Sequence, residues 1–164
     1  MTFAGRRRRA AIGVWIAVAF GGLTPATHAA AVAAVACVQE PEGAKVYAAS
    51  CLSCRLATGL GQEGKYPPLA GSEWVSGDAG RLVRIVLHGL TGEIEVQGET
   101  WSGLMPPWGP TLGDSAIAAV TTYVRTKWGN GAPRVTVADV ARIRARDIAR
   151  KTPWTAKELS TPGR

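Results

Sequence analysis

The sequence has few cysteines, few aromatic residues and a shortage of negative charge. Three cysteines in 164 residues are too few for the disulfide framework that stabilises many small secreted domains. Aromatic side chains make up 7% of the chain, and 12 acidic residues stand against 19 lysines and arginines. The length accommodates roughly one domain plus extensions, which excludes a large multidomain enzyme. The 20 glycines and 10 prolines are scattered among apolar segments, which is untypical of a disordered or collagen-like chain.

Much of the positive charge lies at the N-terminus. A block of four arginines at 6–9 precedes a 14-residue apolar run over 10–23 and an alanine-rich stretch over 29–36. The run is shorter than the roughly 20 apolar residues that span a membrane, so the pattern predicts a secretory signal peptide over residues 1–30, with a linker over 31–39. An uncleaved anchor, lengthened by the alanines, is the alternative. Without the four arginines the net charge falls from +7 to +3, and the case for a nucleic-acid partner largely disappears.

The rest of the chain carries the patterns of several helices. Helices are expected over residues 40–54, 78–89 and 114–129, each with a capping residue, an acidic first turn or a glycine stop. Residues 93–101 alternate apolar and polar side chains around Gln97-Gly98, which suggests a small hairpin.

A further helix is expected in the C-terminal segment. Thr136 and Asp139 have the spacing of a capping box, and the pattern ends before Pro153. Residues 132–164 carry a net charge of +5. They are therefore predicted to form a basic helical extension, either a solvated helix face or a docking surface for an acidic partner or anionic lipid.

The connections between these helices are long for so small a domain, and such loops usually wrap a bound group. Cys51 and Cys54 form a Cys-x-x-Cys pair near a helix end, and Met105 lies between Gly103 and Pro106. No phosphate-binding glycine loop, nucleophile triad or carboxylate pair is apparent, so the sequence does not indicate a catalyst.

Taken together, these features resemble a class I c-type cytochrome of the bacterial periplasm. The resemblance rests on the segments 43–54, 87–90 and 105–109. It implies an all-α, cytochrome c-like fold over residues 40–131, with three core helices and long loops around one covalent haem c. It also implies a periplasmic electron carrier, or a haem subunit, that serves a dehydrogenase or oxidase as redox partner, with association in a membrane complex.

The resemblance assigns roles to individual residues. Cys51 and Cys54 correspond to the cysteines that hold haem covalently, and Met105 to the methionine that ligates iron. Position 55, where the family has its axial histidine, is arginine. A guanidinium stays protonated and offers no lone pair, so Arg55 cannot ligate iron. His88 is the one histidine beyond the predicted signal peptide and is considered as a substitute ligand.

Three outcomes remain open at this point. Haem is attached through the two cysteines with one axial position lacking a protein ligand, or the iron is ligated from elsewhere. Alternatively, the chain is a haem-free relic whose Cys51–Cys54 dithiol or disulfide belongs to a binding or assembly subunit. A thiol-exchange centre is disfavoured because the pair lies toward a helix C-terminus, where the helix dipole opposes a thiolate. Cys37 is expected to be a free thiol.

Overall fold

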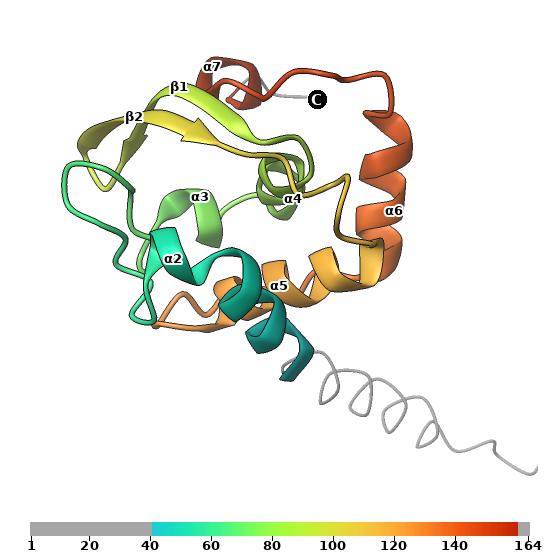
Figure 1. Ribbon diagram of the computed structural model, residues 1–164, viewed down its shortest axis with the longest axis horizontal. Helices are drawn as coiled ribbons and strands as arrows, with labels where there is room; N and C mark the ends of the chain where they lie inside the picture. The colour runs from blue at the N-terminus through green and yellow to red at the C-terminus, as the bar shows by residue number, and fades with distance from the viewer. Residues whose placement is uncertain (1–40, 161–164) are drawn as a thin grey trace, which may run out of the picture.

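The computed structural model describes residues 41–160, so the predicted signal peptide, linker and Cys37 lie outside the described residues. A helical segment over residues 41–50 comes first. It is followed by α2 (Leu52–Arg55), α3 (Glu73–Ser76), α4 (Ala79–His88), β1 (Leu90–Val96), β2 (Glu99–Met105), α5 (Asp114–Thr126), α6 (Val137–Arg146) and α7 (Ala156–Leu159). The strands lie on one side of α4, with α5 and α6 on the other sides (Figure 1).

The predicted capping residues begin their helices. The Asp78 carboxylate accepts a hydrogen bond from the Gly80 N–H at 2.8 Å, at the start of α4. Thr136 and Asp139 form the predicted capping box of α6. The four-residue helices α3 and α7 were not predicted, because one helical turn is too short to show an apolar period.

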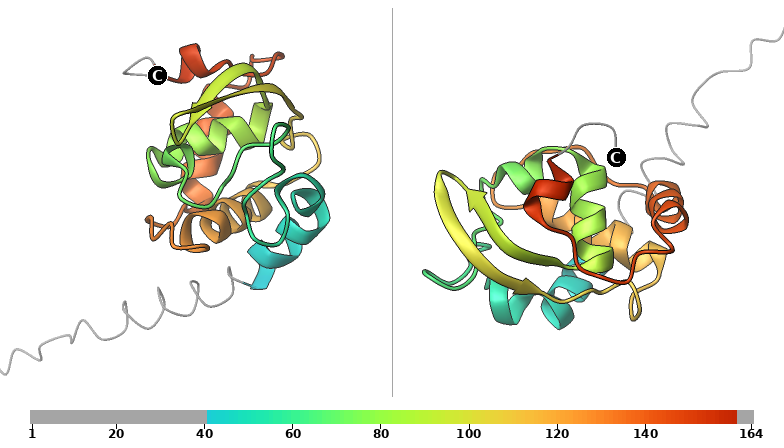
Figure 2. Two further views of the ribbon diagram at one scale, coloured as in Figure 1. Left: turned by 90° about the vertical axis from the view of Figure 1, so that its left-hand side faces the viewer. Right: turned by 90° about the horizontal axis from the view of Figure 1, so that it is seen from above.

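The hairpin corrects the all-α prediction, since the described chain is helix-rich but contains a two-stranded antiparallel sheet. β1 and β2 pair from Leu90↔Met105 to Val96↔Glu99. Gln97 and Gly98 form the turn with φ values of 55° and 79°, the left-handed conformation that two-residue hairpin turns require. The hairpin curves along one side of the molecule when seen from above (Figure 2).

The core contains two apolar clusters that share Leu112 at their edges. One joins α4 and α5 to the C-terminal segment through Val83, Leu87, Ile117, Ala118, Val135, Val140 and Ile143. The other joins the first helical segment to α3, α4 and α5 through Val46, Tyr47, Val75, Leu82, Val120 and Val124. The segment after residue 131 therefore packs into the same core as the preceding helices and is not an appended surface element.

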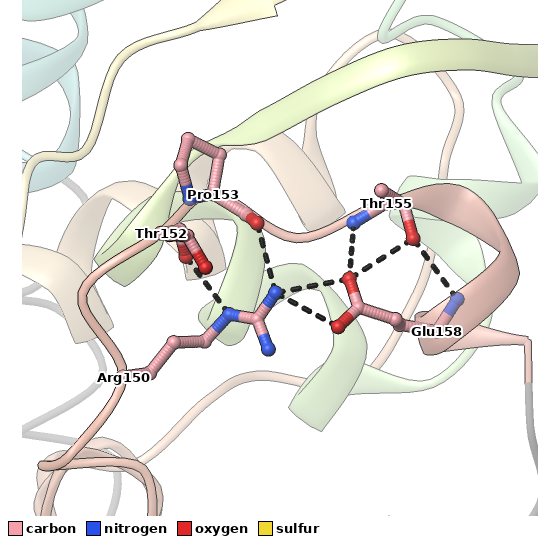
Figure 3. A network of polar contacts seen from close by, with 5 residues as sticks. All are labelled: Arg150, Thr152, Pro153, Thr155 and Glu158. Atoms are coloured by element: carbon pink, nitrogen blue, oxygen red, sulfur yellow. Dashed lines mark hydrogen bonds and ion pairs between the residues drawn. The ribbon is translucent and has the colours of Figure 1, made fainter.

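The last described residues are also tied to the hairpin. Trp154 is buried. Its N–H donates to the Gly89 carbonyl, and its carbonyl accepts a hydrogen bond from the Thr91 N–H in β1. The Arg150 guanidinium stacks 3.5 Å from the centre of the Trp154 ring. It also donates to two backbone carbonyls and to the Glu158 carboxylate, which itself caps α7 (Figure 3). These contacts fix the C-terminal segment across the end of α4.

Candidate functional site

The cysteine pair lies where the first helical segment gives way to α2. The chain stays helical through this point because the Cys51 N–H donates to the Tyr47 carbonyl and the Arg55 N–H to the Cys51 carbonyl, both at 2.9 Å. Leu56 ends the helix with a φ of 58°, and the Tyr47 hydroxyl donates to its carbonyl at 2.7 Å. Cys51 and Cys54 are free, partly buried thiols three residues apart on this turn.

A largely apolar cavity of about 180 Å³ opens beside the two cysteines. Its walls come from the cysteine-bearing helix, the loop after it, α4, α5 and both strands. Cys51, Cys54, Arg55 and Met105 all line it, although Met105 lies about fifty positions further along the chain. The structure therefore brings together the residues to which the sequence resemblance assigned a common site.

Met105 is positioned by the end of the hairpin. It closes β2 opposite Leu90, and two prolines stiffen the chain that follows. Gly89 permits this approach, since its φ of 82° is open to glycine and a Cβ there would collide with the Met105 carbonyl oxygen. The thioether of Met105 therefore lies at the end of β2, which approaches the end of α4 closely at Gly89.

Arg55 crosses the cavity towards this methionine. Its Nη1 donates to the Pro67 carbonyl at 2.7 Å, and its Nη2 lies 3.9 Å from the Met105 sulfur. The guanidinium therefore connects the cysteine-bearing helix, the proline-rich loop and the methionine strand. Sequence reasoning missed this contact, because nothing in the local pattern relates position 55 to position 105.

Burial governs the chemistry of the ionisable groups in the cavity. Burial raises the pKa of the Cys51 thiol to about 11, against the opposing effect of the Arg55 guanidinium. Burial likewise lowers the pKa of Arg55 from its usual value, while the two neighbouring thiols act in the other direction. Cys51 is consequently a thiol at neutral pH, which is unlike the acidic cysteine of a disulfide-exchange centre.

His88 does not line this cavity. It ends α4, and its ring meets the buried Trp154 ring edge-on at 6.4 Å between centroids. Its Nε2 is buried without a hydrogen-bond partner in the described part of the chain. Burial lowers the pKa of His88, so the ring is neutral at pH 7.

Two arginines hold the segments around the site: Arg125, to which no sequence pattern assigned a role, and Arg144, which the charge pattern placed on a solvated or docking helix face. Arg144 of α6 donates to Asp114 at 2.6 Å and to the Gly109 and Leu112 carbonyls at 2.8 Å each, which fixes the loop after Met105. Arg125 of α5 donates to three further carbonyls, that of Val75 in α3 and those of Gly77 and Pro133. Arginines on a helix usually indicate a solvated face, so no sequence signal predicted these hydrogen bonds.

The Cys-x-x-Cys turn, the apolar cavity and the methionine-bearing strand define a c-type cytochrome domain. Residues 38–124 match the family described as cytochrome C oxidase, cbb3-type, subunit III, and the chain belongs to that family. Family membership implies a covalently bound haem c and electron transfer rather than catalysis.

Several curated proteins are similar over the same region. Cytochrome c-552 of Thermus thermophilus is 36% identical over 118 residues, which cover 66% of this chain and 88% of the relative. The gluconate 2-dehydrogenase cytochrome c subunit of Pantoea cypripedii is 39% identical over 110 residues, or 62% of this chain and 24% of the relative. The cbb3-type cytochrome c oxidase subunit FixP of Azorhizobium caulinodans is 33% identical over 90 residues, or 54% and 27%.

The residues of the cavity fit haem c in part. The free thiols, the apolar walls and the Met105 thioether suit a covalently held porphyrin with a sulfur-ligated iron. Arg55 supplies no ligand, and its direct contact with Met105 leaves no space between the two side chains for a porphyrin. The thiols and the thioether therefore fit haem c, whereas the residue at position 55 does not.

Within residues 41–160, no helix combines the length and the apolar character that crossing a bilayer requires.

Proposed function

We propose that the chain is a periplasmic electron-transfer protein, exported by the signal peptide over residues 1–30. In this proposal Cys51 and Cys54 hold one haem c and Met105 ligates its iron. The observation that carries the proposal is the convergence of two free thiols and one thioether on a single apolar cavity in a c-type cytochrome domain.

A bound haem c supplies reversible one-electron chemistry at its iron. The chain's own residues then attach, orient and shield the group. The two thiols fix it to the helix end, Met105 presents a thioether from the hairpin, and the apolar walls keep water from the cavity. Burial and axial ligation are the features by which a protein sets the reduction potential of such a group.

The proposed partner is a dehydrogenase or an oxidase in a membrane complex. Relatives of this domain include cytochrome subunits of gluconate and alcohol dehydrogenases and of a cbb3-type oxidase. The chain spans only 22% to 27% of the length of these subunits. It therefore corresponds to one cytochrome domain within each of them.

A second candidate is a haem-free descendant that acts as a binding or assembly subunit. The contact between Arg55 and Met105 favours it, because the guanidinium lies 3.9 Å from the sulfur to which a haem iron would bind. In this case the two cysteines remain a dithiol or form a disulfide.

One experiment separates the two candidates. The full chain is produced in a bacterial host with a c-type maturation apparatus, and the purified protein is examined by haem staining on a denaturing gel and by its reduced visible spectrum. The electron-transfer proposal expects stain that survives denaturation and is lost when Cys51 and Cys54 are both replaced by alanine. Colourless protein, alongside a control cytochrome that matures normally, rejects the proposal in favour of the haem-free candidate.

A further inference from the structure

The outer face of α6 is apolar where a surface helix is usually polar. The inner face packs Val140 and Ile143 into the core, so the opposite positions should carry polar or charged side chains. Several exposed positions on that side instead carry small or aliphatic residues, which we call the apolar stripe: Val137, Ala138, Ala141, Ala145, Ile148 and Ala149. Val137 and Ile148, near its two ends, are 42% and 68% exposed. Apolar residues that gather on one exposed face indicate contact with another apolar surface.

Cations border the apolar stripe. Arg142 and Arg146 occupy the remaining exposed positions of α6, with side chains 67% and 50% exposed, and the exposed Lys151 follows the helix. Asp139 is the one carboxylate in α6, and it is already held by the helix cap and by Arg142 at 2.6 Å. The outer face of this helix therefore combines apolar surface with positive charge.

A groove of about 310 Å³ lies between α4 and α6 beside this face. Arg142 and Arg146 line it together with the buried Arg84, the ion-pair partner of Asp147, so three guanidiniums gather there. Two carboxylates also line the groove, and each is engaged as a helix cap: Asp78 and Asp139. Guanidiniums bind phosphate through charge-assisted hydrogen bonds. The groove therefore suits a phosphate group that lies next to the apolar stripe.

This face is separate from the cavity beside the cysteines. Among residues 41–160, those that line the cavity end at Val124, whereas the apolar stripe begins at Val137. In Figure 1, α6 lies at the right-hand edge of the molecule, while α2 and the turn of the hairpin lie towards the left. A surface that docks against α6 therefore leaves α2 and the hairpin free to meet another molecule.

We propose that the outer face of α6 docks on an anionic phospholipid surface, with the apolar stripe against the acyl chains and Arg142 and Arg146 on the phosphate groups. The inference is independent of the group that the cysteine cavity holds. Each arginine or lysine near an anionic surface adds attraction to the modest apolar burial. A lipid surface is favoured over an acidic partner helix because the stripe continues past the end of α6 to Ile148, whereas a seam between two helices follows the helix.

The test is co-sedimentation with vesicles of the protein as it is secreted into the periplasm of a bacterial host. One set of vesicles is an equimolar mixture of phosphatidylglycerol and phosphatidylcholine, and the other is phosphatidylcholine alone. Binding to the anionic vesicles should be at least about tenfold stronger and should decrease as the salt concentration rises. Arg142→Gln combined with Arg146→Gln should weaken it at least about tenfold, and Ile148→Ser at least about threefold.

Lys45→Gln combined with Lys65→Gln is the matched control, because both lysines are exposed and lie outside α6 and its groove. This variant loses the same charge as the double arginine variant, yet it should bind the anionic vesicles within about twofold of the parent. Equal weakening in the two double variants overturns the inference, since net charge alone would then explain the binding. Thermal unfolding at the parent's temperature shows that each variant is folded.

Two further outcomes overturn the inference. The first is a parent that binds neutral and anionic vesicles equally. The second is a parent that stays in solution with both; if it is also a dimer that Ile148→Ser dissociates, the outer face of α6 is an interface between two copies of the chain. Haem staining of the sedimented protein tests the proposed function separately, because vesicle binding is expected whether or not the cavity holds haem.

Discussion

At the scale of single residues, position 55 determines which chemistry the cavity supports. A histidine there offers a lone pair to iron and is short, whereas Arg55 offers only donors and extends as far as the Met105 sulfur. The sequence alone identified the exclusion of Arg55 as a ligand. It did not identify the Arg55 contacts with Pro67 and Met105, because these depend on how three distant segments meet.

Arg55→His is expected to convert the chain into a histidine/methionine-ligated cytochrome. The variant should incorporate more haem than the parent and gain a low-spin spectrum, including the weak far-red band of ferric iron bound to methionine sulfur. Adding Met105→Ala should abolish that band while haem stays attached through Cys51 and Cys54. A variant that remains haem-free in a host that matures a control cytochrome would show that the cavity has lost more than one ligand.

His88 predicts a dependence of stability on pH. Burial lowers its pKa below the usual 6.5, Asp147 opposes this, and Arg144, Arg150 and Lys151 reinforce it. The unfolded chain therefore binds a proton at a higher pH than the folded chain does, and the free energy of unfolding decreases as the pH falls from about 6.5 towards the folded pKa. Urea titrations of the parent at neutral and mildly acidic pH measure this decrease.

The control for this effect is His88→Gln, which has no group that titrates in the same range. The parent should lose more stability than His88→Gln between the two pH values. An equal loss in both proteins would assign the acid sensitivity to other groups.

At the scale of elements, the sequence predicted long elements better than short ones. Helices α4, α5 and α6 begin at the predicted capping or acidic residues, since those signals act over one turn. The hairpin was expected over residues 93–101 but extends from Leu90 to Met105. Its outer positions lack clear alternation, because Leu104 is apolar although it is 65% exposed, and Gly92 and Gly103 have no side chain to show a pattern.

The junction between α4 and β1 provides a test of how Met105 is held. Gly89→Ala places a methyl group against the Met105 carbonyl at a φ of 82° and a ψ of 175°, a conformation essentially restricted to glycine. The variant should lose about 1–3 kcal/mol of unfolding free energy. In a haem-loaded Arg55→His background it should also weaken the far-red band, because the strand end that carries the sulfur is displaced.

Gly98→Ala is the matched control for this variant. Gly98, in the turn of the same hairpin, has a similar φ of 79°, but a Cβ there meets nothing within 4 Å, and Gly98 does not line the cavity. It should cost backbone strain without altering the methionine band. If the two variants change the band equally, general strain in the hairpin would explain the effect, and the Gly89–Met105 contact would not.

At the scale of the whole molecule, the charge pattern of the C-terminal segment predicted a surface appendage, whereas its packing makes it part of the core. Its net charge of +5 predicted a basic appendage. In the structure, Val135 and Val140 are 1% and 0% exposed within a cluster built from α4 and α5, and the buried Arg84 is paired with Asp147 at 3.0 Å. Composition counts charges on the outer face of a helix and does not report what its inner face covers, so the sequence could not reveal this packing.

This packing predicts that the segment is needed for folding. A chain that ends at residue 131 should fail to show cooperative thermal unfolding, because its loss uncovers one of the two apolar clusters. A milder variant, Ile143→Ala, should cost about 2–5 kcal/mol of unfolding free energy, since Ile143 is 3% exposed in that cluster. On the same helix, Val137 is 42% exposed, so Val137→Ala should change stability by less than about 0.5 kcal/mol. Cooperative unfolding of the truncated chain at the parent's temperature would instead show that residues 41–131 form a self-sufficient core and that α6 only covers it.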